Sequence, residues 1–151
     1  MTNTMTTAAT AEQGLTSRAT LTTGIAIGAG LALLANLVVY LIGDAGAPIR
    51  VVTGWEPDGA DLTLIEVVIA SIVWVTIGAA VLWLMERRLT VAFRRWIVLA
   101  AATTIASLVP LLGLDADAGS KLALSAMHIV VGASTITGQA LARRAPVRQR
   151  R

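Results

Sequence analysis

The stretch LTTGIAIGAGLALLANLVVYLI, residues 21–42, decides the fold class of this chain, because it runs for 22 residues without a charge. As an α-helix it would measure roughly 33 Å at about 1.5 Å per residue, which matches a hydrocarbon core of about 30 Å. A water-soluble helix of this length would show a polar face, and this stretch shows almost none. It therefore predicts a membrane-spanning helix.

Three further apolar stretches follow, at about 62–85, 96–114 and 122–142. A mean hydropathy of +0.75 and a charged fraction of only 14% agree with a chain whose core faces lipid. Strands cannot cross lipid alone, because their backbone groups would lack hydrogen-bond partners. We therefore expect an all-α fold, an integral membrane four-helix bundle, with only a short extended segment conceivable at 49–53.

The bundle should form one domain over residues 19–144, between two short tails. Residues 1–18 are rich in Thr and Ala and lack an apolar period, so we expect a disordered tail there. Residues 145–151 form a basic tail. The first apolar stretch is too long for the core of a signal peptide, so we expect it to be retained as an anchor.

Orientation follows from the basic residues beside the spans, which mark the cytoplasmic side of the plasma (inner) membrane. Ten of the twelve basic residues fall on one side of the predicted spans, and both termini are on that side. We therefore expect both tails to be cytoplasmic, and the loops 43–61 and 115–121 to face outward. The ten are Arg18, Arg87, Arg88, Arg94, Arg95, Arg143, Arg144, Arg148, Arg150 and Arg151.

Composition excludes several classes of function. The chain has no cysteine, so thiol nucleophiles, iron–sulfur clusters and thiolate zinc sites are absent from it. A b-type haem normally needs two axial ligands, and this chain has a single histidine. No residue spacing resembles a metal site either, so we expect no metal and no cofactor. Its basic residues flank spans instead of forming an aromatic-laced face, which argues against nucleic acid. No nucleophile stands beside a base, so we do not expect an enzyme.

Three polar side chains are predicted at similar depth below the outer surface. Asn36, Glu66 and His128 lie on the first, second and fourth spans, roughly 6–9 Å inside their outer ends at about 1.5 Å per residue. Ionisable residues within spans usually face the bundle interior and find partners there. They are our candidates for a polar centre or ligand site.

Periodic small and polar residues indicate which helix faces point inward. On the first span Gly24, Gly28, Ala32 and Asn36 recur every fourth residue, which permits close helix packing. The same stripe would also suit a homodimer, although packing within the chain is the interpretation we favour. Similar stripes follow on the last two spans, as Ala100, Thr103 or Thr104, Ser107 and Pro110 or Leu111, and as Ser125, His128, Gly132, Thr135 and Gln139.

Two interpretations of the polar residues stay open. A functional centre would bind a proton, a metal ion or a small polar ligand through Glu66 and His128. In a structural role, each polar side chain would form a single interhelical hydrogen bond, worth about 0.6 kcal/mol. For His128 we favour this second interpretation. Glu66 lies about one turn inside the membrane, so its side chain could also reach the headgroups.

The inner arginines have a simpler explanation. Each gains on the order of 1 kcal/mol beside anionic headgroups, so we expect them to anchor the cytoplasmic face to the lipid bilayer. These anchoring residues are Arg87, Arg88, Arg94, Arg95, Arg143 and Arg144.

Residues 19–144 resemble a family of uncharacterised four-span bacterial membrane proteins that is common in high-GC Gram-positive bacteria. The resemblance is carried by MERR at 85–88, ASLVPLLG at 106–113 and LALSAMHIVVG at 122–132. It implies the four-span fold and no particular activity. We therefore predict a small membrane protein with an accessory, regulatory or envelope-associated role. The alternative is a small proton-coupled transporter that uses Glu66.

Overall fold

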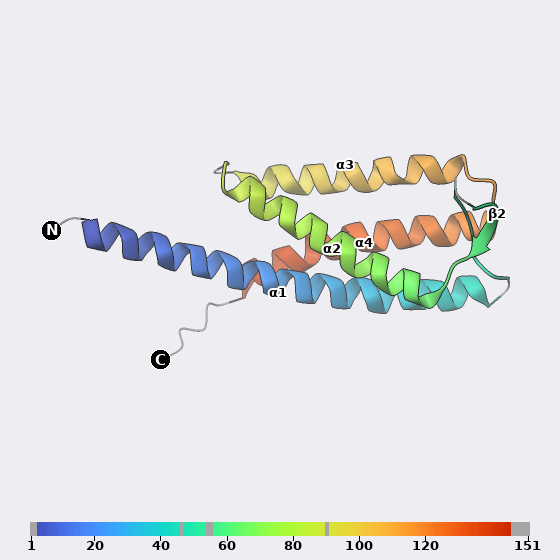
Figure 1. Cartoon of the computed structure of the whole chain (residues 1–151), viewed down its shortest axis with the longest axis horizontal. Coiled ribbons are helices and arrows are strands. Elements are labelled where there is room, and N and C mark those ends of the chain that lie inside the picture. The colour runs from blue at the N-terminus through green and yellow to red at the C-terminus, as the bar shows by residue number, and fades with distance from the viewer. Residues whose placement is uncertain (1–2, 46, 54–55, 90, 146–151) are drawn as a thin grey trace.

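The computed structural model describes residues 3–45, 47–53, 56–89 and 91–145, and it is dominated by helix. In these residues four helices run side by side along the long axis (Figure 1). Each contains a segment long and apolar enough to cross a membrane, which confirms the predicted four-span, all-α architecture. The helices are α1 (Asn3–Asp44), α2 (Leu64–Glu86), α3 (Ala92–Leu112) and α4 (Ala118–Arg144).

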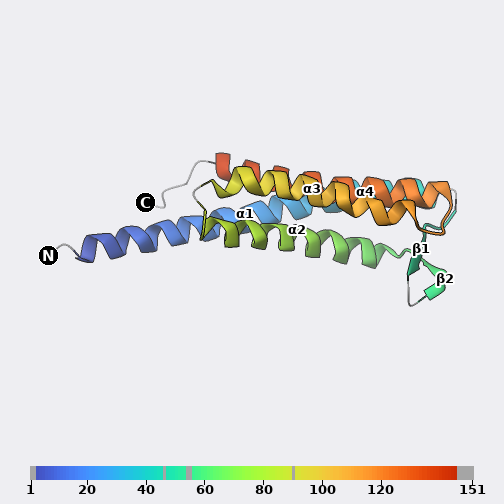
Figure 2. The same ribbon diagram turned by 90° about the horizontal axis from the view of Figure 1, so that it is seen from above.

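The N-terminal region differs from the sequence expectation. Residues 3–18, for which we expected a disordered tail, continue α1 as helix, and this part extends beyond the other helices (Figure 2). The segment holds no proline and only one glycine, Gly14. Adding residues to an existing helix gains one hydrogen bond each and avoids a new nucleus, so the first span can extend into the preceding segment. The span itself covers Arg18–Asp44.

A small β-hairpin lies in the loop between α1 and α2, and its first strand overlaps the segment 49–53 that the sequence allowed to be extended. Strands β1 (Arg50–Thr53) and β2 (Glu56–Asp61) pair antiparallel, with Arg50 opposite Asp61 and Val51 opposite Ala60. Two consecutive valines favour the extended backbone in β1. Gly59 in β2 has a φ of 74°, a conformation that suits glycine. The hairpin lies beyond the ends of the helices, so the unpaired backbone N–H and C=O groups on its outer edges do not need partners inside lipid.

Helix α4 is the centre of the bundle, and glycines set its distance from each neighbour. It packs most extensively on α1, where a Cβ atom at Gly138 would lie 2.5 Å from the backbone nitrogen of Gly28. A Cβ at Gly78 of α2 would lie 2.7 Å from Cγ2 of Thr135. The predicted inward stripe on α1 is buried, and it is occupied by contacts within the chain.

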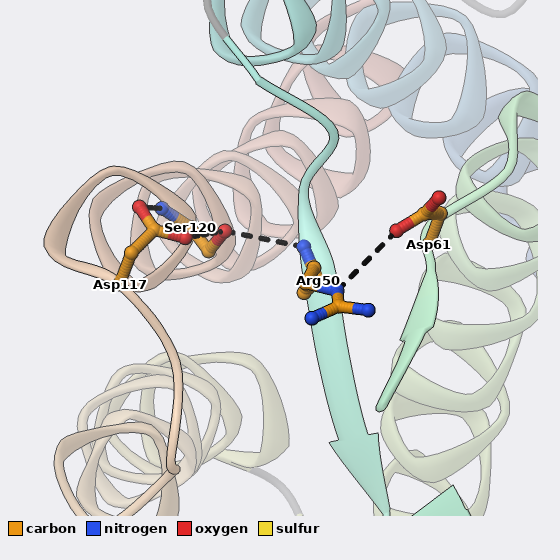
Figure 3. A network of polar contacts seen from close by, with 4 residues as sticks. All are labelled: Arg50, Asp61, Asp117 and Ser120. Carbon is orange, nitrogen blue, oxygen red and sulfur yellow. Dashed lines mark hydrogen bonds and ion pairs between the residues drawn. The ribbon is translucent and has the colours of Figure 1, made fainter. Parts of the chain in front are cut away.

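The hairpin is fixed to the bundle by one buried side chain and a polar network. Ile49 is buried in an apolar cluster with Ala123, and its carbonyl accepts from the backbone nitrogen of Leu62 at 2.7 Å. The backbone nitrogen of Arg50 donates to Ser120 Oγ at 3.1 Å (Figure 3). The hairpin therefore lies over the α4 N-terminus.

Asp117 completes this network as the N-cap of α4. Its carboxylate accepts from Ser120 Oγ at 2.5 Å and from the Ser120 backbone nitrogen at 3.0 Å, as Figure 3 shows. These hydrogen bonds favour the ionised carboxylate, and they lower the pKa of Asp117 below its ordinary value. The negative cap fits the positive end of the helix dipole.

The opposite end of the bundle is closed by side chains of α2, α3 and α4. Trp96 is buried and donates its indole N–H to the carbonyl oxygen of Gly78 at 2.8 Å. Arg143 pairs with Glu86, and its guanidinium lies 4.4 Å from the centre of the Phe93 ring. Here α2 and α3 are held together, whereas they diverge toward the hairpin (Figure 1).

Candidate functional site

A groove of about 510 Å³ lies between the diverging helices α2 and α3. α4 forms its floor, Asn36 of α1 reaches it, and residues of the hairpin lie at its outer end. It arises because α2 packs mainly on α1 while α3 packs mainly on α4, which leaves α2 and α3 apart from each other toward the hairpin. Most of its lining is apolar. The residues that line the groove include Asn36, Glu66, Trp74, Trp96, Ala100 and His128.

The groove opens sideways, at the height of the spans. Its rim includes Trp74, which is 59% exposed, together with the exposed side chains of Ile77 and Leu99. Trp74 lies near the middle of the 23-residue helix α2. A molecule dissolved among lipid tails would therefore meet this opening directly, without passing through either aqueous side.

Asn36 contributes a buried polar atom that lacks a partner. Its Nδ2 donates to Ser71 Oγ at 2.9 Å, and this bond joins α1 to α2. The residue is only 3% exposed, and its Oδ1 has no hydrogen-bond partner in the described part of the chain. Such a buried acceptor costs about 1–3 kcal/mol when it is unpaired.

His128 is fixed by its own helix. Its Nδ1 lies 2.8 Å from the carbonyl oxygen of Leu124. Because a carbonyl oxygen only accepts, Nδ1 carries the hydrogen, and in the neutral ring Nε2 is left as an acceptor. Among the described residues, no side chain or backbone group hydrogen-bonds to Nε2.

Glu66 belongs to a capping box at the start of α2, and it does not bond to His128. Its Oε2 accepts from the Thr63 backbone nitrogen at 2.7 Å and from Thr63 Oγ1 at 2.8 Å, while its own backbone nitrogen donates to Thr63 Oγ1. The side chain is exposed. The three candidate residues thus line one groove, but as separate hydrogen-bonding units. The pattern Thr63-Leu64-Ile65-Glu66 is itself the sequence signature of this cap.

A comparison with family models finds a match over residues 16–146, which include all four spans and every residue that lines the groove. The chain belongs to DUF6069, a family of unknown function. This confirms the predicted membership of an uncharacterised family. Neither the curated proteins nor the solved structures contain a match to this chain.

Sequence patterns did not single out the aromatic residues of the groove in this DUF6069 chain. Trp74 alone in an apolar span is indistinguishable from a lipid-facing side chain, and Trp96 stands at the start of a predicted span, where aromatic residues are common. Two hydroxyl residues of the predicted stripe on α3 form hydrogen bonds within their own helix. Thr104 Oγ1 donates to the carbonyl oxygen of Ala100 at 2.9 Å, and Ser107 Oγ to that of Thr104 at 2.7 Å.

The arginines of this DUF6069 chain at the end that carries the α2–α3 turn include two that contact neighbouring side chains. Arg143, one of the residues predicted to anchor headgroups, pairs with Glu86 where the ends of α2 and α4 meet. Arg87 lies 3.5 Å over the ring of Trp83. The exposed arginines at this end are Arg87, Arg88, Arg94, Arg95, Arg143 and Arg144.

The described residues gather no group of three or more His, Asp or Glu side chains that would hold a metal ion. Side chains that can form hydrogen bonds with a ligand in the groove include Asn36, Glu66, Trp74, Thr103 and His128. This arrangement suits recognition of a polar group on an otherwise apolar molecule.

Proposed function

We propose that this protein is a non-enzymatic plasma-membrane protein that binds a lipophilic small molecule in the groove between α2 and α3. The observation that carries the proposal is the buried Asn36, whose Oδ1 lacks a partner and which is one of the lining residues of an apolar groove open at span height. Buried polar atoms are nearly always hydrogen-bonded, so each exception requires an explanation. A polar group of a bound molecule would supply the missing bond.

The size and lining of the groove support this proposal. A volume of about 510 Å³ lies within the range of about 300–1,000 Å³ typical of small-molecule sites. Such sites combine apolar walls with a few polar groups that orient the ligand. Binding of this kind fits an accessory, regulatory or envelope-associated role, in which the protein presents or senses a membrane-dissolved molecule.

Trp74 offers a direct test, because it lies on the groove rim. A long-chain alcohol and its methyl ether, each tagged with bromine on the chain, are titrated into the protein in uncharged detergent. At least one of the two is expected to quench tryptophan fluorescence saturably. In Ala100→Phe, which places a ring in the groove, this saturable phase should disappear.

Ala101→Phe is the matched control, since Ala101 is exposed and does not line the groove. It should bind like the unmodified chain. Quenching that never saturates, or that is equal in both variants, would mean ordinary contact with the tag and would contradict the proposal. Thermal unfolding of each variant checks that it is folded.

The proposal includes an orientation with both termini in the cytoplasm. Six exposed arginines lie at the end of the bundle that carries the α2–α3 turn, whereas Arg50 lies with Asp61, Asp115 and Asp117 at the hairpin end. Basic residues beside spans favour the cytoplasmic side. On that side the arginines would contact anionic lipid headgroups, each with a gain of about 1 kcal/mol.

Cysteine labelling tests this orientation, because the chain has no native cysteine. Ala118 at the hairpin end and Arg88 at the other end are both exposed. In intact cells a membrane-impermeant maleimide should label Ala118→Cys, while Arg88→Cys should react only after the membrane is permeabilised. Labelling of Arg88→Cys alone in intact cells would overturn the orientation.

Proton-coupled transport through Glu66 is not part of the proposal. Its carboxylate accepts two hydrogen bonds from Thr63 within the first turn of its own helix, and the side chain is exposed. A capping role accounts for these contacts. A homodimer through α1 likewise lacks support, because its small-residue stripe packs inside the chain.

A further inference from the structure

We infer that the groove prefers a lipophilic cation, a molecule with an apolar chain and a positively charged, ammonium-like polar end. The inference rests on the proposed function, and it names the chemical class of the ligand. Neutral side chains do not decide this class, because Asn36, Thr103 and His128 together offer the groove both donors and acceptors. The charged side chains decide it, because those that line the groove all have the same sign.

Two carboxylates line the groove, and both belong to its outer end. Asp61 is the last residue of β2, and Glu66 lies in the first turn of α2. In the described part of the chain, no Arg or Lys lines the groove, and most of the remaining lining is apolar. A molecule whose chain lies along the apolar lining, with its polar end outward, would place that end beside two carboxylates.

Neither carboxylate is fully used by its neighbours. The hydrogen bonds from Thr63 both fall on Oε2 of Glu66, and none from the described residues falls on Oε1. Asp61 Oδ1 lies 3.7 Å from Nε of Arg50, and both side chains are 62% exposed (Figure 3). Because a loose and exposed ion pair is weak, a second cation can compete for this carboxylate.

The charge around the outer end of the groove has the same sign. Among the described side chains at the hairpin end, carboxylates outnumber basic groups. Such an excess raises the local concentration of cations and lowers that of anions. The carboxylates are Asp44, Asp61, Glu66, Asp115 and Asp117, and the basic residues are Arg50 and Lys121.

The depth of Trp74 predicts where the chain of the ligand lies. Trp74 follows Glu66 on α2 by about 12 Å at about 1.5 Å per residue, and both residues line the groove. A cation held at Glu66 therefore directs its chain past the Trp74 ring. Bromine in the middle of the chain should quench tryptophan fluorescence more strongly than bromine beside the polar end, and this difference should disappear in Trp74→Phe.

The experiment compares a trimethylammonium, an alcohol and a carboxylate that share one bromine-tagged chain. Each is titrated at pH 8 into the protein in uncharged detergent, with saturable tryptophan quenching as the readout. The ammonium should bind about three- to tenfold more tightly than the alcohol, a modest ratio because exposed carboxylates attract weakly. The carboxylate should bind most weakly of the three.

A single-chain phosphocholine with the same tag separates two sources of the cation. Its phosphate would meet the carboxylates, so we expect weaker binding than for the plain ammonium, which identifies a free lipophilic cation. Equal binding would identify the cationic headgroup of a lipid as the ligand. Either result supports recognition of a cation, provided that the carboxylate probe binds more weakly than both.

Glu66→Gln and Asp61→Asn each remove one charge with little change in shape, and glutamine also suits this position of a capping box. Each should lower the ammonium affinity about two- to threefold, and the double variant should bind ammonium and alcohol alike. Asp115→Asn is the matched control, since Asp115 is exposed at the same end and does not line the groove. It should leave the ammonium-to-alcohol ratio nearly unchanged.

The outcomes separate this inference from the proposed function. Equal, saturable binding of ammonium and alcohol that Ala100→Phe abolishes would overturn the preference for cations, while the binding function would stand. An ammonium preference that persists in the double variant, or tightest binding of the carboxylate, would overturn the inference as well. The absence of saturable quenching by every probe would contradict the binding function itself.

Discussion

Gly138→Ala is expected to destabilise the bundle by about 1–3 kcal/mol, the usual cost of inserting a methyl group into a packed core. The new Cβ would lie 2.5 Å from the backbone nitrogen of Gly28 and 2.6 Å from the carbonyl oxygen of Gly24. These are backbone atoms, so no rotamer change relieves the overlap, and α1 and α4 must separate. Gly138→Leu should abolish the folded state.

The cost falls on the most extensive helix pair of the chain. In lipid, helices associate through close packing and hydrogen bonds, because the tails are as apolar as the side chains they replace. Separating the two backbones therefore removes the main attraction between them. The measurement is thermal unfolding in detergent, followed by circular dichroism.

Gly30→Ala is the matched control, because a Cβ atom there would meet nothing within 4 Å. It is the same chemical change in a span helix, and alanine is the better helix former. Its stability should be equal to or slightly above that of the unmodified chain. Equal unfolding temperatures for Gly138→Ala and Gly30→Ala would contradict close backbone contact between α1 and α4.

Ile49→Ala is expected to cost about 2–5 kcal/mol, the range for truncating a large buried aliphatic side chain. Ile49 is 1% exposed, and it packs in the apolar cluster beneath the hairpin. A Cβ atom added at Gly43 would lie 2.9 Å from its Cδ1, which shows how closely α1 approaches it. Its loss leaves a cavity and releases the hairpin from α4.

The expected signature is a lower unfolding temperature together with faster proteolysis in the loop 45–63. Leu112→Ala at the same end of the bundle is the control, since Leu112 is 76% exposed and should change stability by less than about 0.5 kcal/mol. If both variants unfold alike and the loop remains protected, Ile49 does not anchor the hairpin. Trp74 quenching in Ile49→Ala then reports whether the hairpin also shapes the groove.

The sequence predicted three polar residues at similar depth, but it did not predict their hydrogen bonds. Depth along each span placed Asn36, Glu66 and His128 near one level, and all three line the groove. Their partners depend on short local geometry. Glu66 bonds to Thr63, three residues earlier, and His128 to Leu124, four residues earlier, so each finds a partner without a second helix.

The sequence by itself determined the number of spans, the asymmetry of charge and the inward faces of the helices. Each of these properties sums over neighbouring residues of one segment, because transfer into lipid and helical periodicity are local. The pattern Gly24, Gly28, Ala32, Asn36 therefore marked the α1 face that is buried in the bundle.

Only the tertiary structure decided that α2 and α3 diverge and leave a groove. That divergence depends on how α1 and α4 pack together, through contacts such as Gly138 with Gly28, and on α2 packing mainly on α1 while α3 packs mainly on α4. Crossing angles follow from how such contacts combine, and no single segment encodes them. The unpaired Asn36 Oδ1 and the exposed Trp74 acquire significance only because this arrangement places them in one groove.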